Sequence, residues 1–204
     1  MSSNSFDERA ATWDEDPKKR QRADGVAESI RTAVALRPDM RLLEYGAGTG
    51  LVSQALRDHV GPITLADSSQ GMLDVLRAKV ADGVLPDARV LDLDLSRDPA
   101  LDERFDLIVT VMTLHHIPDL DPVLDGFAAM LEDGGHLCVV DLEREDGSFH
   151  GHGFPGHEGF DRDPLAERLR KSGFGDIRFQ HAYKMEKSEH SFDLFLMTCV
   201  RGGR

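Results

Sequence analysis

Apolar residues along this chain follow two patterns that alternate in a regular order. Short continuous apolar runs predict buried strands, and runs with apolar residues three and four positions apart predict amphipathic helices. Strands are predicted from Met40 to Tyr45 and over Ile63–Asp67, Arg89–Leu95, Phe105–Met112 and His136–Leu142. Strands that alternate with helices indicate an α/β fold built on a parallel sheet.

Helical spacing fills the segments between these strands. Helices are predicted over 18–36, 50–59 and 69–81, from Asp121 to the pair Gly134-Gly135, and from Asp163 to Gly173. Residues 1–17 look irregular, and the period is lost again over 143–160. The tail predicts two strands, 174–179 and 191–201, with a polar reversal over 185–190.

The length of 204 residues suits one domain with a sizeable core. We divide it into an N-terminal lid or helix (1–38), a ligand-binding core (39–142), a substrate loop (143–160) and a C-terminal helix and hairpin (161–204). Long loops without regular structure in compact domains tend to be functional. The loop over 143–160 leaves the carboxyl end of a predicted strand, so it can reach a ligand at that edge of the sheet.

Composition excludes several function classes. The net charge of −13 disfavours nucleic acid as a partner, and no apolar run reaches the length that spans a bilayer. The polar N-terminus carries no secretory signal, so we expect a cytoplasmic protein without a membrane partner. Cys138 and Cys199 lie in apolar runs and are expected to be buried reduced thiols without metal-type spacing.

A glycine-rich turn joins the first predicted strand to a helix. Gly46, Gly48 and Gly50 allow positive φ and close approach of backbone to a ligand, and Glu44 stands just before them. Open α/β sheets bind ligands at the carboxyl ends of their strands. Asp67 ends the next strand, 17 residues past Gly50, near the spacing of a ribose-binding acid. The alternative is that Asp67 or Ser68 caps the following helix.

Two motifs resemble those of class I S-adenosylmethionine-dependent methyltransferases. The glycine turn, as E-x-G-x-G-x-G, resembles their motif I, and the run F-D-L-I-V…L-H-H-I-P-D resembles their later strand and loop. The resemblance implies a Rossmann-like sheet of seven mostly parallel strands with helices on both faces. It further implies an antiparallel C-terminal hairpin in which the seventh strand lies between the fifth and the sixth.

The resemblance also implies the cofactor S-adenosyl-L-methionine, the product S-adenosyl-L-homocysteine, and a set of cofactor-binding residues. Asp94 would bind the adenine amino group, with Asp92 as the near alternative, and Met72 would face the cofactor or serve as plain core. The full implied set is Glu44, Tyr45, Gly46, Ala47, Gly48, Thr49, Gly50, Asp67, Ser68, Met72, Leu93, Asp94, Leu95, Thr110, Val111, Met112 and His115.

The implied chemistry is in-line methyl transfer to a small-molecule acceptor with an O, N or C nucleophile. A base is needed if the acceptor is a hydroxyl or a protonated amine, and His115 or His116 is the candidate. The alternatives are a methyltransferase acting on protein or nucleic acid, and a non-catalytic cofactor-binding module. The glycine spacing disfavours a nicotinamide dehydrogenase, whose turn reads G-x-G-x-x-G.

Residues on the acceptor side follow from less specific signals. Trp13, with Phe6 before it, either packs against the domain edge or closes as a lid, and the resemblance favours the lid. His150 and His152 are substrate-contact candidates in the 143–160 loop. These two and His157 are separated by glycines and form no rigid ligand face, so no metal is predicted. The acceptor-binding segments carry no transferable code, and the oligomeric state is open.

Overall fold

The computed structural model describes residues 3–151, 153–187 and 189–203, with side chains from Phe6 onward. Seven strands share one sheet in the order β3-β2-β1-β4-β5-β7-β6. This order, with β7 between β5 and β6, confirms the Rossmann-like topology that the resemblance to class I methyltransferases implied. The chain divides into two compact units, one through Asp94 and one from Leu95.

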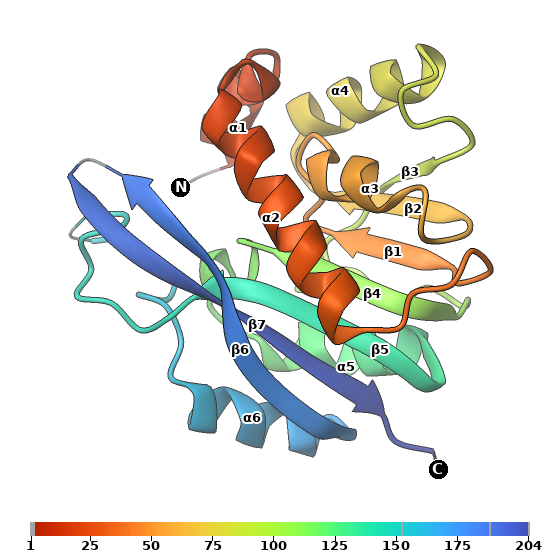
Figure 1. Cartoon of the computed structure of the whole chain (residues 1–204). Coiled ribbons are helices and arrows are strands. Elements are labelled where there is room, and N and C mark those ends of the chain that lie inside the picture. The colour runs from red at the N-terminus through yellow and green to blue at the C-terminus, as the bar shows by residue number, and fades with distance from the viewer. Residues whose placement is uncertain (1–2, 152, 188, 204) are drawn as a thin grey trace. The chain divides into compact units, whose positions relative to one another are not determined.

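Among its described residues, the first unit holds three parallel strands, four α-helices and one 3-10 turn (Figure 1). Its strands are β1 (Leu42–Tyr45), β2 (Ile63–Asp67) and β3 (Arg89–Asp92), and β2 pairs in parallel with both others. Its helices are α1 (Ser3–Ala10), the 3-10 turn η1 (Trp13–Glu15), α2 (Pro17–Ala33), α3 (Leu51–Leu56) and α4 (Gln70–Ala81). All four residues of β1 are buried, as expected for a strand covered on both faces.

The second unit combines two parallel strands with an antiparallel hairpin (Figure 1). Strands β4 (Phe105–Val111) and β5 (Leu131–Leu142) are parallel, and β7 (His190–Arg201) runs antiparallel to both β5 and β6 (Phe174–Lys187). The 3-10 turn η2 (Leu114–His116) follows β4, and helices α5 (Asp121–Met130) and α6 (Arg162–Lys171) complete the unit.

The N-terminus is more ordered than its sequence indicates. Residues 3–10 and 13–15 are helical, so the expectation of an irregular segment over 1–17 is wrong. Periodicity misses α1 because the helix is polar and is held by contacts to α4 rather than by an apolar stripe. The next helix, α2, begins at Pro17 and ends at Ala33, three residues short of the predicted end, and its N-cap Asp16 accepts from the Lys18 amide.

Two further boundaries differ from the predictions for a tertiary reason. Helix α5 ends at Met130 rather than at Gly134-Gly135, because Leu131 is extended and pairs with Phe105 of β4. The glycines then lie within an irregular start of β5, where the register shifts between Phe105 and Leu107. Strand β6 runs on to Lys187, well past Phe179, because its whole length pairs with β7.

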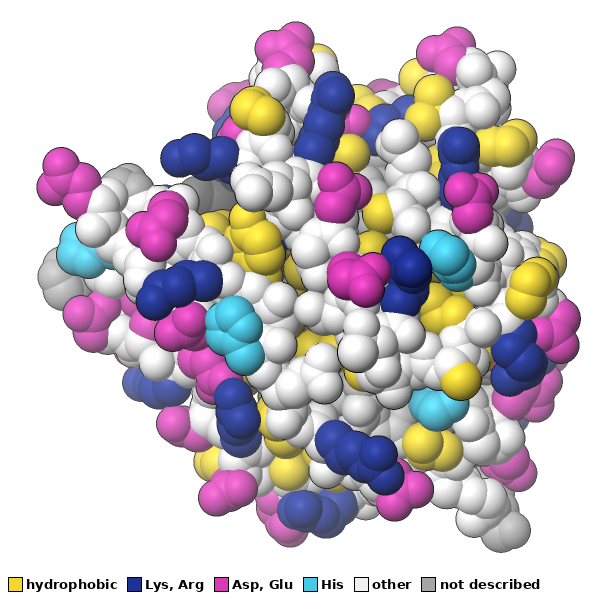
Figure 2. All heavy atoms as spheres, in the orientation of Figure 1, with side chains coloured by type: hydrophobic (Ala, Val, Ile, Leu, Met, Phe, Trp, Pro, Cys, Tyr) yellow, Lys and Arg dark blue, Asp and Glu magenta, His cyan; other side chains and the backbone are white. Residues whose placement is uncertain are grey.

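Acidic and basic side chains both lie at the surface of this acidic protein. On the face in Figure 2, lysine and arginine side chains stand among aspartates and glutamates and form no continuous basic stripe. No helix in the described part of the chain is long and apolar enough to cross a bilayer.

Candidate functional site

The glycine turn after β1 uses its three glycines in different ways. Gly46, Gly48 and Gly50 all have positive φ, at 69°, 56° and 77°. A Cβ on Gly50 would lie 2.9 Å from Leu76 and 3.1 Å from Leu85, so this glycine lets α3 pack closely on the core. A Cβ on Gly48 would meet nothing within 4 Å. The backbone at Gly48 therefore borders open space of the kind a bound cofactor needs.

Asp67 ends β2 directly beside this turn. Its Oδ2 accepts from the Gly48 amide at 2.7 Å and its Oδ1 accepts from the Ser69 amide at 2.9 Å. The N-cap of α4 is Ser69, whose side chain accepts from the Met72 amide, so neither Asp67 nor Ser68 caps this helix. Desolvation by burial raises the pKa of the Asp67 carboxyl, against the lowering effect of these amides. Each carboxylate oxygen keeps lone-pair capacity for a ligand hydroxyl.

Glu44 lies underneath the turn and is 3% exposed. Its Oε2 accepts from the Ser53 amide at 3.0 Å and from the Ser53 hydroxyl in a short contact. Burial raises the pKa of Glu44 from its ordinary 4.5 to about 7, although the Ser53 hydrogen bonds oppose the shift. This acid holds the first turn of α3 against β1, which fixes the shape of the glycine loop.

The N-terminal segment is fastened to the glycine turn and to α4. Asp14 accepts from the Thr49 hydroxyl at 2.6 Å and lies 2.5 Å from Nζ of Lys79. Lys79 also donates to the Thr49 carbonyl at 2.7 Å. Asp7 of α1 accepts from the Ser69 hydroxyl at 2.6 Å and from the Gly71 amide at 2.9 Å. Two acids from residues 1–16 therefore connect this segment to the ends of β1 and β2.

Trp13 lies in the same segment and packs against its neighbours. Its ring centroid is 6.2 Å from that of Phe6, and Nζ of Lys19 lies 3.8 Å from the indole centroid. The guanidinium of Arg9 lies 5.3 Å from both rings. Trp13 is thus held by the N-terminal segment itself, and its proposed role as a lid over the acceptor stays a prediction.

The other cofactor candidates of the first unit differ in exposure. Met72 is 2% exposed, which favours the core alternative for this side chain. Ser68 is exposed, Tyr45, Ala47 and Leu93 are buried, and Asp94 is half-buried whereas Asp92 at the end of β3 is exposed. The two acids therefore differ in exposure, and the assignment of Asp94 to the adenine amino group stays a prediction.

Most candidates of the second unit lie at or just after the end of β4, whereas Leu95 lies beside Gly126 of α5. Leu95, the first residue of this unit, is 3% exposed and Thr110 is 1% exposed; Val111 is half-buried. Met112 adopts a φ of 54°, a strained conformation for a side chain of this size. Among described residues, the Thr110 hydroxyl has no hydrogen-bond partner. Buried unpaired groups and strained backbone concentrate at functional sites. The end of β4 has both features, which supports it as part of a candidate site.

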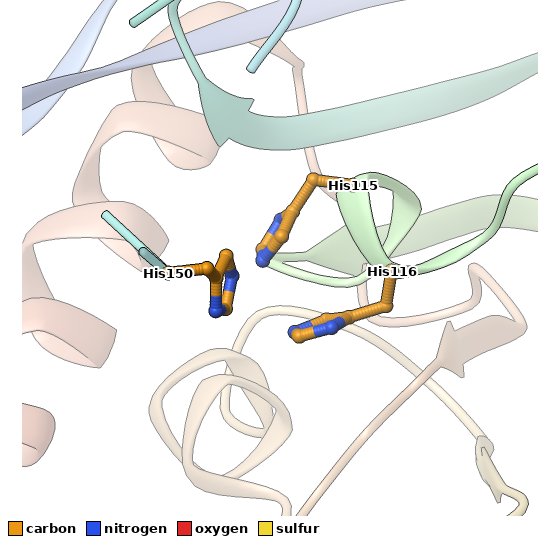
Figure 3. A group of neighbouring side chains, drawn as sticks. All are labelled: His115, His116 and His150. Carbon is orange, nitrogen blue, oxygen red and sulfur yellow. The ribbon is translucent and has the colours of Figure 1, made fainter. Parts of the chain in front are cut away.

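Three histidines meet in the second unit, as Figure 3 shows. His115 and His116 lie on η2, and His150 comes from the 143–160 loop. One nitrogen from each ring lies within 4.8 Å of the others. The ring centroids of His115 and His116 are 4.1 Å apart, and His150 stacks on Phe154 at 3.8 Å. The structure thus joins both base candidates, His115 and His116, to His150, one of the three substrate candidates.

His115 is oriented by a buried acid that the sequence analysis did not single out. Its Nδ1 lies 2.6 Å from Oδ1 of Asp141, and its amide donates to Oδ2 at 3.3 Å. Asp141 is fully buried and also accepts from the Leu142 amide at 2.8 Å. An acid closing an apolar strand run was the available signal, because a buried carboxylate needs partners.

Burial, together with smaller effects of the neighbouring His115 and Lys187, lowers the pKa of His150 from its ordinary 6.5 to about 4. His150 is therefore neutral at physiological pH. Its backbone position follows from Phe149, whose amide donates to Glu145 Oε2 at 3.0 Å and whose carbonyl accepts a short contact from Lys187.

The described residues of the 143–160 loop form no helix or strand, as predicted, and the loop is tied to η2. The His157 amide donates to the His115 carbonyl at 2.8 Å, and Nε2 of His157 lies 3.0 Å from the Ile117 carbonyl. A Cβ on Gly156 would approach the His115 carbonyl to 2.1 Å, so only glycine allows this contact. His157 is a loop anchor, and His152 lies outside the described residues.

The strand order of the sheet and the glycine turn after β1 are both features of class I S-adenosylmethionine-dependent methyltransferases. A family model described as a methyltransferase domain matches residues 18–193, and the chain belongs to this family. An uncharacterized methyltransferase of Schizosaccharomyces pombe is 35% identical over 57% of this chain and 43% of its own length. A ubiquinone biosynthesis O-methyltransferase of Marinobacter nauticus is 32% identical over 53% of this chain and 47% of its own.

The chain spans less than half the length of these curated relatives. Among solved structures, the N-methyltransferase NodS from Bradyrhizobium japonicum, in complex with S-adenosyl-L-homocysteine, gives a TM-score of 0.74. It is 17% identical, and the match covers 98% of both chains. At this identity the likeness shows the fold.

Proposed function

We propose that this chain transfers a methyl group from S-adenosylmethionine to a small-molecule acceptor. The observation that carries the proposal is the glycine turn, where the open side of Gly48 adjoins the half-buried carboxylate of Asp67. Such a cradle suits a sugar-bearing ligand that lies against backbone. The family membership and the name of the M. nauticus relative, a ubiquinone biosynthesis enzyme, support a small acceptor.

The chain's own residues would bind, orient and accept a proton. When bound, S-adenosylmethionine supplies an electrophilic methyl group on a sulfonium. Asp67 would accept hydrogen bonds from ribose hydroxyls and Asp94 would bind the adenine amino group. For a hydroxyl or ammonium acceptor, a ring nitrogen of His115 or His116 would take the proton. Positioning and desolvation carry most of the rate in such transfers.

Release of S-adenosylhomocysteine tests the proposal. The protein is incubated with methyl-labelled S-adenosylmethionine and, separately, with fractions of metabolites, proteins and nucleic acids from cells. We expect product release and label transfer with the metabolite fraction, and loss of both with Asp67→Ala. Label in protein or nucleic acid alone would overturn the small-molecule acceptor. Binding of the cofactor without turnover in any fraction would identify a non-catalytic module.

A further inference from the structure

The geometry points to a divalent metal site of the zinc class formed by His115, His116 and His150. One nitrogen from each imidazole lies within 4.8 Å of the others, and the three rings turn toward a common point (Figure 3). Imidazole nitrogens are preferred ligands of zinc and the later first-row metals. Three such ligands leave a fourth position open, which is the arrangement of catalytic rather than structural zinc sites.

The hydrogen bonding of His115 prepares one ligand. With Asp141 ionised, its Oδ1 accepts the proton on Nδ1 of His115 at 2.6 Å, so the lone pair lies on Nε2. That Nε2 is buried and has no hydrogen-bond partner among described residues. A carboxylate that holds the second nitrogen of a histidine is the usual outer partner of a metal-bound imidazole. Asp141 is therefore a positioning residue for this site.

The surroundings of His150 also suit a ligand. Both of its ring nitrogens are buried and lack a hydrogen-bond partner within the described chain. Its ring is held between Phe154, stacked at 3.8 Å, and Phe149, edge-on at 4.7 Å. These aromatic walls offer the His150 nitrogens no hydrogen-bonding alternative. Buried polar groups of this kind call for a ligand, an ion or an ordered water.

The distances fit a site that closes on its ion. Zinc binds imidazole nitrogen at about 2.0–2.1 Å, so tetrahedral ligand nitrogens stand roughly 3.3 Å apart. Closing from 4.8 Å requires side-chain shifts on the order of an ångström. Rotation about the side-chain bonds of the three histidines can supply shifts of this size.

The donor set also predicts selectivity. Magnesium and calcium prefer oxygen ligands, and both oxygens of Asp141, the nearest buried carboxylate, already accept hydrogen bonds from His115 and Leu142. We therefore expect Zn²⁺ and Co²⁺ to bind and Mg²⁺ not to bind. The inference concerns metal binding by the second unit and does not depend on methyl transfer. With an ion bound, the nitrogens of His115 and His116 that hold it cannot also take a proton, so the base role of these residues belongs to the metal-free protein.

Metal binding by tag-free full-length protein tests the site. After treatment with a chelator and dialysis, the protein is titrated with Zn²⁺, Co²⁺ or Mg²⁺ and bound metal is measured by elemental analysis. We expect one Zn²⁺ per chain and a Co²⁺ absorption spectrum of tetrahedral type. A cluster that holds only water would bind no Zn²⁺ in this titration, and that result would overturn the proposal.

Variants locate the ion. His150→Ala should lower Zn²⁺ affinity by at least about a hundredfold, and Asp141→Asn by about ten- to a hundredfold. The exposed His181 of β6 offers the matched control, because His181→Ala removes an imidazole outside the cluster. An apo unfolding midpoint for His150→Ala equal to that of the unmodified chain separates ligand loss from misfolding. Zn²⁺ affinity that survives His150→Ala, or falls equally in His181→Ala, contradicts the site.

Discussion

Nδ1 of His115 lies 2.6 Å from Oδ1 of Asp141, and the two side chains are 1% and 0% exposed. The carboxylate reaches this ring from the end of β5, while His115 stands on the turn after β4. Because both side chains are buried, neither can form hydrogen bonds with water in place of the bond to its partner. The pair fixes the tautomer and orientation of the central histidine of the cluster.

Asp141→Asn should therefore destabilise the fold by about 1–3 kcal/mol. An asparagine offers one oxygen and one NH₂ where the structure has two acceptors, so one donor of His115 or Leu142 would face another donor. Denaturant unfolding measures the change. Asp193→Asn is the control, since Asp193 meets His181 at 3.3 Å with half of each side chain exposed, and we expect less than about 0.5 kcal/mol there. Equal effects at both positions would contradict the burial argument.

Asp67→Ala should weaken S-adenosylmethionine binding by about ten- to a hundredfold, because a charge-assisted hydrogen bond contributes roughly 1.5–3 kcal/mol. The change also removes acceptors from the Gly48 and Ser69 amides, so some loss of stability is expected. Calorimetric titration measures affinity on the folded fraction. Asp67→Asn is the informative companion, since it keeps an acceptor for one amide but loses the charge. Unchanged cofactor affinity in both variants would leave Asp67 only its structural hydrogen bonds to the Gly48 and Ser69 amides.

Asp94→Ala should weaken cofactor binding more than Asp92→Ala. The two acids are two residues apart, but Asp94 is half-buried and Asp92 is exposed. A hydrogen bond from an adenine amino group requires a carboxylate that is partly shielded from water. The pair serves as its own control, since each variant removes one negative charge from the same segment. A larger loss of affinity in Asp92→Ala would reverse the assignment.

Much of the fold could be predicted because strands and turns depend on local sequence. Strand β2 has the predicted bounds, and the order of β7 between β5 and β6 followed from the resemblance. The misses have tertiary causes. Helix α1 is polar and forms where Asp7 caps α4, and α5 stops at Met130 because Leu131 joins the sheet. Neither contact leaves a periodic trace in the sequence.

The geometry of the glycine turn in the first unit could be predicted from the sequence, whereas the histidine cluster of the second unit could not. Spacing identifies Gly46, Gly48 and Gly50 because the three act within one turn. His150 joins His115 only through the fold of a loop anchored at His157, more than thirty residues along the chain. Asp14 and Lys79 likewise meet across the first unit. Such pairs depend on chain geometry that composition and periodicity do not encode.

Glu44 should make the stability of the ligand-free protein depend on pH. Its folded pKa of about 7 is above the ordinary 4.5, so the folded state holds the proton more tightly than the unfolded chain. The stabilisation is full below pH 4.5 and is lost as pH rises through 7, by roughly 3 kcal/mol over that interval. Glu44→Gln should remove this slope in unfolding experiments at a series of pH values.

The exposed Glu28 provides the comparison for Glu44. Glu28→Gln should leave the pH slope between 4.5 and 7 in place. Ser53→Ala should move the loss of stability to higher pH, because it removes the hydroxyl that lowers the pKa of Glu44. A slope that persists in Glu44→Gln would assign it to other groups.

Asp14→Asn should release the N-terminal segment from the glycine turn. Asp14 meets Lys79 at 2.5 Å with side-chain exposures of 24% and 14%, and the same carboxylate accepts from the Thr49 hydroxyl. A shielded charge pair of this kind should couple by about 1–2 kcal/mol in a double-mutant cycle with Lys79→Met. The single tryptophan, Trp13, is adjacent to Asp14, so its quenching by acrylamide reports the release directly.

We expect quenching to rise in Asp14→Asn and Lys79→Met, and S-adenosylmethionine to dissociate faster, since Thr49 belongs to the turn that would hold it. The exposed pair of Arg31 and Glu28 in α2 gives the control, and Arg31→Met should change neither readout. Faster quenching with unaltered cofactor dissociation would show a segment that is fastened to the turn without closing over it. No change in either readout would mean that the contact between Asp14 and Lys79 does not hold the segment.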